Sequence, residues 1–307
     1  MSRRERSMVP DATPTSYYGR PVLKEPVWRW PIGAYFFSGG VAAGSSLLAA
    51  GATVTGNEAL ARQSRVVSLA AVGASAAFLI EDLGKPTRFL HMLRVVKPTS
   101  PMSMGTWILT VFGPAAGAAA MTDVLGILPR VRVMADAVAA ITAPALATYT
   151  AVLIADTAVP IWHEAHRELP FLFAAGAAAG AGGLATALHR PAGAAPARRM
   201  AIAGGIAELA VAKLMESRLG DLAEPYHEGR AGHLRRAAMT ATAAGVATIA
   251  LAGRRRVGAI VGGVLLTAGA AVERYTVVDA GRQSARDPKY IVGPQRARLG
   301  RESDDRS

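Results

Sequence analysis

The sequence has no cysteine in its 307 residues and few histidines. Without cysteine, disulfide bonds and cysteine-ligated iron–sulfur clusters are excluded within this chain. A b-type haem usually needs two axial histidines that face each other inside a helix bundle. The six histidines instead fall in loops or at the ends of apolar runs, at positions 91, 163, 166, 189, 227 and 233. We therefore expect no haem, no iron–sulfur cluster and no other metal site in this chain.

Acidic residues are also scarce relative to basic ones, 22 against 34, which gives a formal net charge of +12. In a soluble protein this excess would suggest nucleic acid as a partner. Here the arginines cluster between apolar runs, as the positive-inside rule expects of a membrane protein. The sequence therefore favours a lipid membrane as partner, and we expect no binding of nucleic acid.

Apolar residues are abundant, at 51% of the chain, and they are gathered into long runs. Eight runs have the length of roughly 17–25 residues that is needed to cross a bilayer core. They lie at Pro31–Val54, Ser64–Leu83, Met104–Val124, Met134–Ala158, Pro170–Leu188, Met200–Leu219, Leu234–Gly253 and Gly258–Val278. We predict an all-α, polytopic membrane protein with about eight transmembrane helices in two four-helix groups. Its parts are a polar N-terminal tail (1–30), the transmembrane domain (31–278) and a polar C-terminal tail (279–307).

With eight spans, both termini lie on one side of the membrane, together with the loops after the second, fourth and sixth spans. Trp28 and Trp30, which flank Arg29, are typical of an interfacial anchor on this side. Total counts of Lys and Arg favour termini in the cytoplasm, whereas the density of basic residues in the short opposite loops favours the reverse. Both orientations stay open at this point.

Charged and polar side chains are concentrated at the end of the second span and in the loop that follows it. Glu81 and Asp82 end an apolar helix and are followed by Gly-Lys-Pro, which helices rarely continue through. After Pro86, apolar positions at helical spacing and a basic face of Arg88, His91 and Arg94 predict a short helix lying along the membrane surface. A proline-rich loop leads from it to Trp107, inside the next span.

We single out three of the carboxylates within predicted spans, because a charged group at membrane depth costs about 2.5–3.5 kcal/mol. Asp136 and Asp156 lie near the ends of the fourth span, within reach of solvent. Glu208 lies near the middle of the sixth, so it must be protonated, hydrogen-bonded across helices or next to a water-filled cavity. A neutral structural glutamate and a proton relay both fit this position. The three residues are our candidate proton path.

Three motifs together resemble a known family. They are W-x4-Y-x-F-x-G-G-x3-G from Trp30 to Gly44, E-D-L-G-K-P-x-R-F from Glu81 to Phe89, and P-x-S-P-M-S-x-G-x-W from Pro98 to Trp107. This combination resembles the polysulfide reductase membrane-subunit family (NrfD/PsrC). The resemblance implies an eight-helix, quinone-reactive subunit in the cell membrane, with menaquinone as the expected quinone. It also implies two partners, a ferredoxin-like iron–sulfur subunit and a molybdopterin catalytic subunit.

Exchange of two electrons and two protons with quinol needs hydrogen-bond donors at the quinone oxygens and a base that passes protons onward. The candidate bases are Glu81 and Asp82. The candidate quinone ligands are Lys85, Arg88, His91 and Trp107, joined by Tyr35 on the first span and by Tyr149, which the resemblance matches to a tyrosine of the fourth helix. An ion pair between Glu81 and Lys85 that only holds the loop is the structural alternative.

Two other classes of protein share some of these features. A secondary transporter would also have many spans and intramembrane charges, but it would usually show inverted repeats and broken helices, and we find none in the sequence. A purely structural anchor would need neither Glu208 nor the elaborate second loop. We therefore expect a subunit that exchanges electrons with quinone without itself holding the catalytic centre of the complex.

Overall fold

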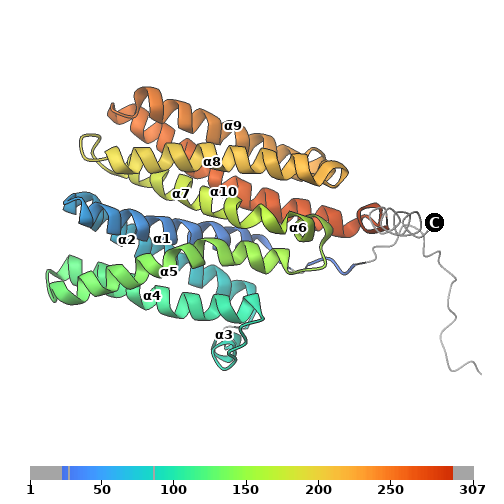
Figure 1. The fold of residues 1–307 in the computed structure, drawn as a ribbon, viewed down its shortest axis with the longest axis horizontal. Helices are drawn as coiled ribbons and strands as arrows, with labels where there is room; N and C mark the ends of the chain where they lie inside the picture. The colour runs from blue at the N-terminus through green and yellow to red at the C-terminus, as the bar shows by residue number, and fades with distance from the viewer. Residues whose placement is uncertain (1–22, 27, 86, 293–307) are drawn as a thin grey trace, which may run out of the picture.

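The computed structural model describes residues 23–26, 28–85 and 87–292. Within these residues the chain is helical and contains no strand, which confirms the predicted all-α class. In this described part, eight long helices run nearly parallel or antiparallel to one another (Figure 1). They are α1 (Trp30–Val54), α2 (Glu58–Asp82), α4 (Pro101–Leu125), α5 (Pro129–Ala155), α7 (Leu169–Leu188), α8 (Ala195–Leu219), α9 (Gly229–Ala252) and α10 (Arg256–Arg286).

The short helices gather at one end of the molecule, the right-hand end in Figure 1. They are α3 (Arg88–Met92), α6 (Pro160–Glu164), η1 (Ala165–Arg167) and η2 (Gly220–Tyr226). The described chain also begins and ends here, so we call this end the terminal face. The opposite end, which we call the loop face, carries only short connections between long helices.

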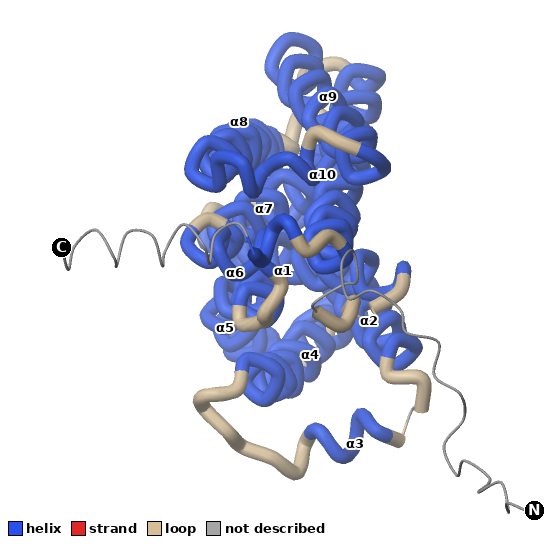
Figure 2. The backbone as a smooth tube through the Cα atoms, turned by 90° about the vertical axis from the view of Figure 1, so that its right-hand side faces the viewer, coloured by secondary structure: helices blue, strands red, loops and turns tan. Residues whose placement is uncertain are grey.

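The long helices form two groups of four, as expected from the sequence. Helices α1, α2, α4 and α5 pack together, α7 to α10 form the second group, and α1 and α7 pack along each other at the seam. Figure 2 shows the two groups end on, one above the other. A Cβ on Gly44 of α1 would stand 2.7 Å from the Cβ of Ala181 on α7, so this glycine permits the close approach of the two groups.

Six of the eight long helices in the described residues are apolar and long enough to cross a membrane, namely α1, α2, α4, α5, α7 and α10. The chain is therefore a multi-pass membrane protein. Among the described helices, α8 and α9 have the length but not the composition, because charged residues interrupt both. Two of these charges, Glu208 of α8 and Arg235 of α9, are buried, and so is Arg274 of α10.

The helices differ from the predicted spans mainly at their ends. Helix α2 begins at Glu58, six residues before Ser64, because Asn57 accepts a hydrogen bond at its start from the backbone N–H of Leu60 (3.3 Å). Arg65 therefore lies well inside α2 rather than at the start of the span. Helix α10 continues past the expected end of the eighth span to Arg286, through residues predicted as polar tail. The surface helix after Pro86 is shorter than its apolar pattern and ends at Met92.

Candidate functional site

A cavity of about 110 Å³ lies in the first helix group, close to the terminal face. Helices α1, α2, α4 and α5 each contribute to its wall, and α3 contributes Met92. The lining residues are Trp28, Ile32, Tyr35, Leu79, Asp82, Leu83, Met92, Met102, Gly105, Thr106, Tyr149 and Leu153. Most of them are apolar, so the cavity suits a mainly apolar ligand that is held by a few polar contacts.

The cavity brings together three of the predicted site residues, Tyr35, Asp82 and Tyr149. Tyr35 and Tyr149 are buried, at 4% and 8% exposure, and within the described residues neither phenol hydroxyl has a hydrogen-bond partner. Asp82 is half-buried and interacts with the backbone N–H and the charge of Arg29. The cavity therefore presents two free donors and one carboxylate, contributed by three different helices.

Small residues determine how closely the helices approach around this cavity. Gly105 of α4 lies against the ring of Tyr149 on α5, and a Cβ at this position would collide with that ring. Ser75 of α2 donates a hydrogen bond to the backbone carbonyl of Tyr35 (3.3 Å), which ties α1 to α2 one turn below the cavity. The positions of the two phenol rings are thus fixed by backbone packing.

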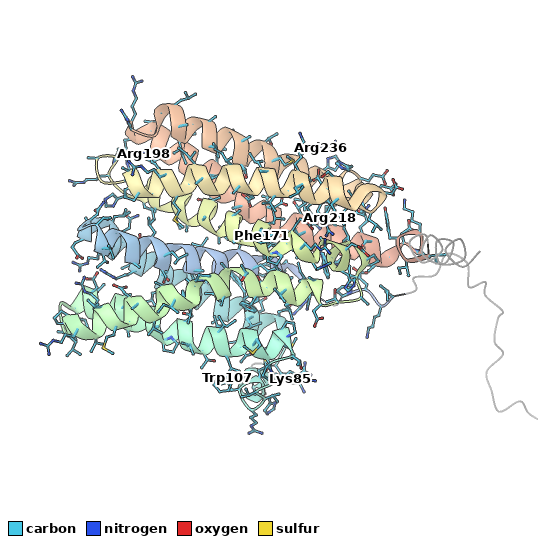
Figure 3. The ribbon with its side chains drawn as sticks, viewed as in Figure 1. Lys85, Trp107, Phe171, Arg198, Arg218 and Arg236 are labelled. Carbon is cyan, nitrogen blue, oxygen red and sulfur yellow. The ribbon has the colours of Figure 1, made fainter. Side chains whose placement is uncertain are left out.

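The other predicted ligands lie outside the cavity. Glu81, Lys85, Arg88 and His91 are exposed, and Arg88 donates from Nη1 to the carbonyl of Leu83 (3.1 Å). Among the described ion pairs, none joins Glu81 to Lys85. The ion pair that would only hold the loop is therefore not formed in this conformation. Figure 3 shows Lys85 beside α3 at the edge of the first group. The structure separates the two adjacent carboxylates, since Asp82 lines the cavity and Glu81 faces outward.

Trp107 anchors the loop that follows α3. Its Nε1 donates to the carbonyl of Val95 (3.2 Å), and the hydroxyl of Ser103 donates to the same carbonyl (2.8 Å). Ser103 also accepts a hydrogen bond from the backbone N–H of Lys97 (3.0 Å). Trp107 therefore has a defined partner in the loop and does not line the cavity.

Trp28 is a cavity residue that the sequence analysis interpreted only as an anchor. It stacks on Trp162 of α6, with ring centroids 5.4 Å apart, and meets the ring of Phe36 edge-on. Trp162 is fully buried and donates from Nε1 to the carbonyl of Val277 on α10 (2.8 Å). No local pattern marks Trp28 as a wall residue, because its partner lies far along the chain.

A second anchor holds the start of the described chain on the terminal face. Glu25 accepts hydrogen bonds from Arg286 Nη2 (2.8 Å), Arg286 Nε (2.9 Å) and Arg282 Nε (2.8 Å). The Arg286 guanidinium holds the pKa of Glu25 below its ordinary value. The described start of the chain thus lies against the end of α10.

Asp136, one candidate for the proton path, lies in an ionic cluster towards the loop face. Arg65, at 2% exposure, binds it through Nε (2.9 Å) and Nη2 (2.8 Å). Arg65 Nη1 also lies 3.1 Å from Asp123, and Arg132 bridges Asp123 to Glu58, with both distances at 3.1 Å. Asp136 is thus an ion-pair partner that joins α5 to α2, at the opposite end of the group from the cavity.

The three proton-path candidates are not brought together. Asp156 caps the C-terminal end of α5 and is exposed on the terminal face. Glu208 lies in the second helix group at 3% exposure. The arrangement offers no single path through Asp136, Asp156 and Glu208.

The cavity suits proton and hydrogen-bond chemistry with a small aromatic or carbonyl ligand. No group of three or more metal-binding side chains occurs in the part of the chain that the structure describes. A family model described as polysulphide reductase, NrfD, matches residues 21–216, which include every residue that lines the cavity. No curated protein matches the chain.

Proposed function

Because the chain belongs to the polysulphide reductase NrfD family, we propose that it is the quinone-reactive membrane subunit of an oxidoreductase complex in the cell membrane. The observation that carries the proposal is the cavity in which Tyr35, Asp82 and Tyr149 meet. Its ligand would be the headgroup of a quinone or quinol, with menaquinone as the first to test.

The residues present fit such a headgroup. An apolar cavity of about 150 Å³ binds benzene in a well-studied model protein, so about 110 Å³ is on the scale of one six-membered ring. The phenol hydroxyls of Tyr35 and Tyr149 are free to donate, and carbonyl oxygens are the acceptors that such donors need. The isoprenoid tail would lie outside this space, among the lipid chains.

The bound quinone would supply the two-electron chemistry, and the side chains of the cavity supply proton transfer and orientation. Tyr35 and Tyr149 donate hydrogen bonds that hold the ring oxygens. Asp82 accepts a proton when quinol is oxidised and returns one when quinone is reduced. Since Glu81 faces outward, Asp82 is the base of the adjacent pair. The quinone would exchange electrons with a ferredoxin-like iron–sulfur partner and, through it, with a molybdopterin subunit.

The quinone site can be tested on the full-length chain in lipid nanodiscs, with quenching of tryptophan fluorescence by a quinone analogue as the readout. One hydrogen bond contributes about 0.5–1.5 kcal/mol, so Tyr35→Phe and Tyr149→Phe should each weaken binding by roughly threefold to tenfold. Tyr275→Phe is the matched control, because Tyr275 lies on α10 outside the cavity. Equal affinities in all three variants would place the quinone elsewhere.

The role of the base has a separate test in the reconstituted complex. Asp82→Asn keeps the shape of the side chain but removes the base, so turnover should fall while quinone affinity changes little. Glu81→Gln is the neighbouring control and should retain turnover, because its side chain faces away from the cavity. Normal turnover of Asp82→Asn would remove this carboxylate from the mechanism.

The exposed basic side chains around α3 are the docking surface that we propose for the iron–sulfur partner. Arg88 and Arg94 are both exposed, next to the wall of the cavity. Replacing both by glutamate should release the partner during copurification while the chain still inserts. The matched control is Arg254→Glu on the loop face, which should leave the complex intact. Copurification of the partner with the double variant would show that it docks elsewhere.

A further inference from the structure

The second helix group contains a buried ionic cluster in addition to the cavity described above. Arg235 of α9 binds Glu216 of α8 (2.5 Å) and Glu273 of α10 (3.0 Å). Arg274, next to Glu273, donates from Nη2 to the carbonyl of Phe173 on α7 (2.7 Å) and lies over its ring. Four helices therefore direct charged or polar groups into one interior region.

Glu208 lies at the inner end of this cluster. A Cβ on Gly176 of α7 would collide with both Oε1 of Glu208 and Nη2 of Arg274, so these two groups adjoin the same small space. Even so, among the described ion pairs none joins Glu208 to Arg274. Gly176 keeps open a space that alanine would fill.

Many polar atoms of this cluster lack a protein partner. Within the described residues, both carboxylate oxygens of Glu208 are buried without a hydrogen bond, as are Nε and Nη1 of Arg274. The same holds for Oε1 of Glu273, Nη2 of Arg235 and the hydroxyl of Tyr226, which is 1% exposed. Burying a polar group without a partner costs about 1–3 kcal/mol in proteins, so this many orphaned atoms in one region favour internal water as their partner.

The charges of the cluster do not balance. Glu208, Glu216 and Glu273 face Arg235 and Arg274, which leaves one negative charge in excess. Around them, α7 contributes only the carbonyl of Phe173 and the backbone of Gly176, and η2 contributes the neutral Tyr226. The nearby Arg218 is paired with Glu168 (2.6 Å). One proton would therefore neutralise the interior, and Glu208 is the carboxylate without an arginine contact.

We propose that Glu208 is a water-connected proton-binding site that is reached from the terminal face along Arg274, Glu273, Arg235 and Glu216. Glu216 is the outer end of this route, because its side chain is 16% exposed and it lies one turn from the end of α8. Glu216 lies eight positions after Glu208, which is about 12 Å along the helix. A proton from bulk water binds the Glu208 carboxylate, and no electron moves.

The test is infrared difference spectroscopy of the full-length chain in nanodiscs, recorded between acidic and alkaline buffer. It needs no quinone, so its outcome is independent of the proposed quinone site. A carbonyl-stretch band of a protonated carboxylic acid should be present, should be lost in Glu208→Gln and should be retained in Asp221→Asn, which changes an exposed carboxylate on the same face. Absence of such a band, or its persistence in Glu208→Gln, overturns the proposal.

The water connection is tested on the unaltered chain, in case Glu208→Gln does not fold. On transfer to heavy water the band should shift at once, because internal water exchanges the proton. Slow exchange would mean a dry, structural carboxylic acid and would overturn the proposal. Gly176→Ala should fill the space beside Glu208 and slow the shift. Gly180→Ala, one turn further along α7, should leave it unchanged, because its Cβ would meet the ring of Phe37 at an ordinary 3.4 Å.

Discussion

Trp28 lies stacked on Trp162, with the two ring planes at 30°, and also forms part of the cavity wall. Since Trp162 is held to the carbonyl of Val277, the stack connects the cavity of the first helix group to α10 of the second. A change in the packing of the two helix groups would therefore move the Trp28 ring and alter the shape of the cavity.

The stack leads to a first prediction. Trp28→Ala removes an aromatic pair worth about 0.5–1.5 kcal/mol and part of the cavity wall, so affinity for a quinone analogue should fall by roughly tenfold. Displacement of a radiolabelled analogue measures this without tryptophan fluorescence. Trp30→Ala is the control, because Trp30 is 58% exposed and lies outside the cavity. An unchanged affinity in Trp28→Ala would show that this ring does not shape the site.

A second prediction concerns Gly105. In Gly105→Ala the added methyl group would meet the ring of Tyr149, and overpacking of this kind costs about 1–3 kcal/mol. The ring should move, and quinone binding should weaken while helix content by circular dichroism is kept. Gly113→Ala on the same helix should bind normally, because a Cβ there meets nothing within 4 Å. Equal quinone affinity of the two alanine variants would show that the methyl group at position 105 does not displace the Tyr149 ring.

The Arg65 cluster gives a third prediction, on stability. Asp136→Asn leaves the guanidinium of Arg65 buried with its main charge partner lost, which typically costs about 3–5 kcal/mol. Thermal unfolding in detergent should show a clearly lower midpoint. Asp156→Asn should unfold close to the wild type, because Asp156 is exposed. A normal midpoint for Asp136→Asn would mean that Asp123 alone satisfies Arg65.

The fourth prediction concerns pH and the contact between Glu25 and Arg286. The folded-state pKa of Glu25 is held below its ordinary value of 4.5, so its contribution is complete above that value and is lost as the pH falls through the folded pKa. The protection of the amides of residues 23–25 against hydrogen exchange, corrected for the intrinsic pH dependence of exchange, should therefore fall in acid. In Glu25→Gln the protection should be low at every pH, whereas in Glu224→Gln, on the same face, it should follow the wild type. Protection that does not depend on pH in the wild type would contradict this prediction.

The sequence predicted the fold well, because each span is a local property of one apolar run. All eight predicted runs became long helices, and the ends differ by only a few residues where a cap such as Asn57 lies outside the run. The far end of α10 was interpreted as polar tail because its residues are polar. It is helical, and its Arg282 and Arg286 bind Glu25, which is more than 250 residues away in sequence.

The site was harder to predict, since it depends on which helix faces which. Tyr35, Asp82 and Tyr149 were among the candidates and line one cavity, although their role as quinone ligands stays a prediction. Lys85 and His91 were proposed from chemistry alone, and the turn after α2 exposes them. Arg65 was not among the candidates, because its partner Asp136 is 71 positions away and no local pattern indicates the pair.

The low hydropathy of α8 and α9 affects how these two helices insert into the membrane during synthesis. Neither helix would enter the bilayer readily alone, because their charges meet partners only in the assembled second group. Helix α8 packs along α7 and α9 along α10, and both of those neighbours are apolar. We therefore expect biogenesis to deliver α7 with α8 and α9 with α10 as hairpins. Chains truncated after α9 during translation should then leave that helix accessible to protease, and extension through α10 should protect it.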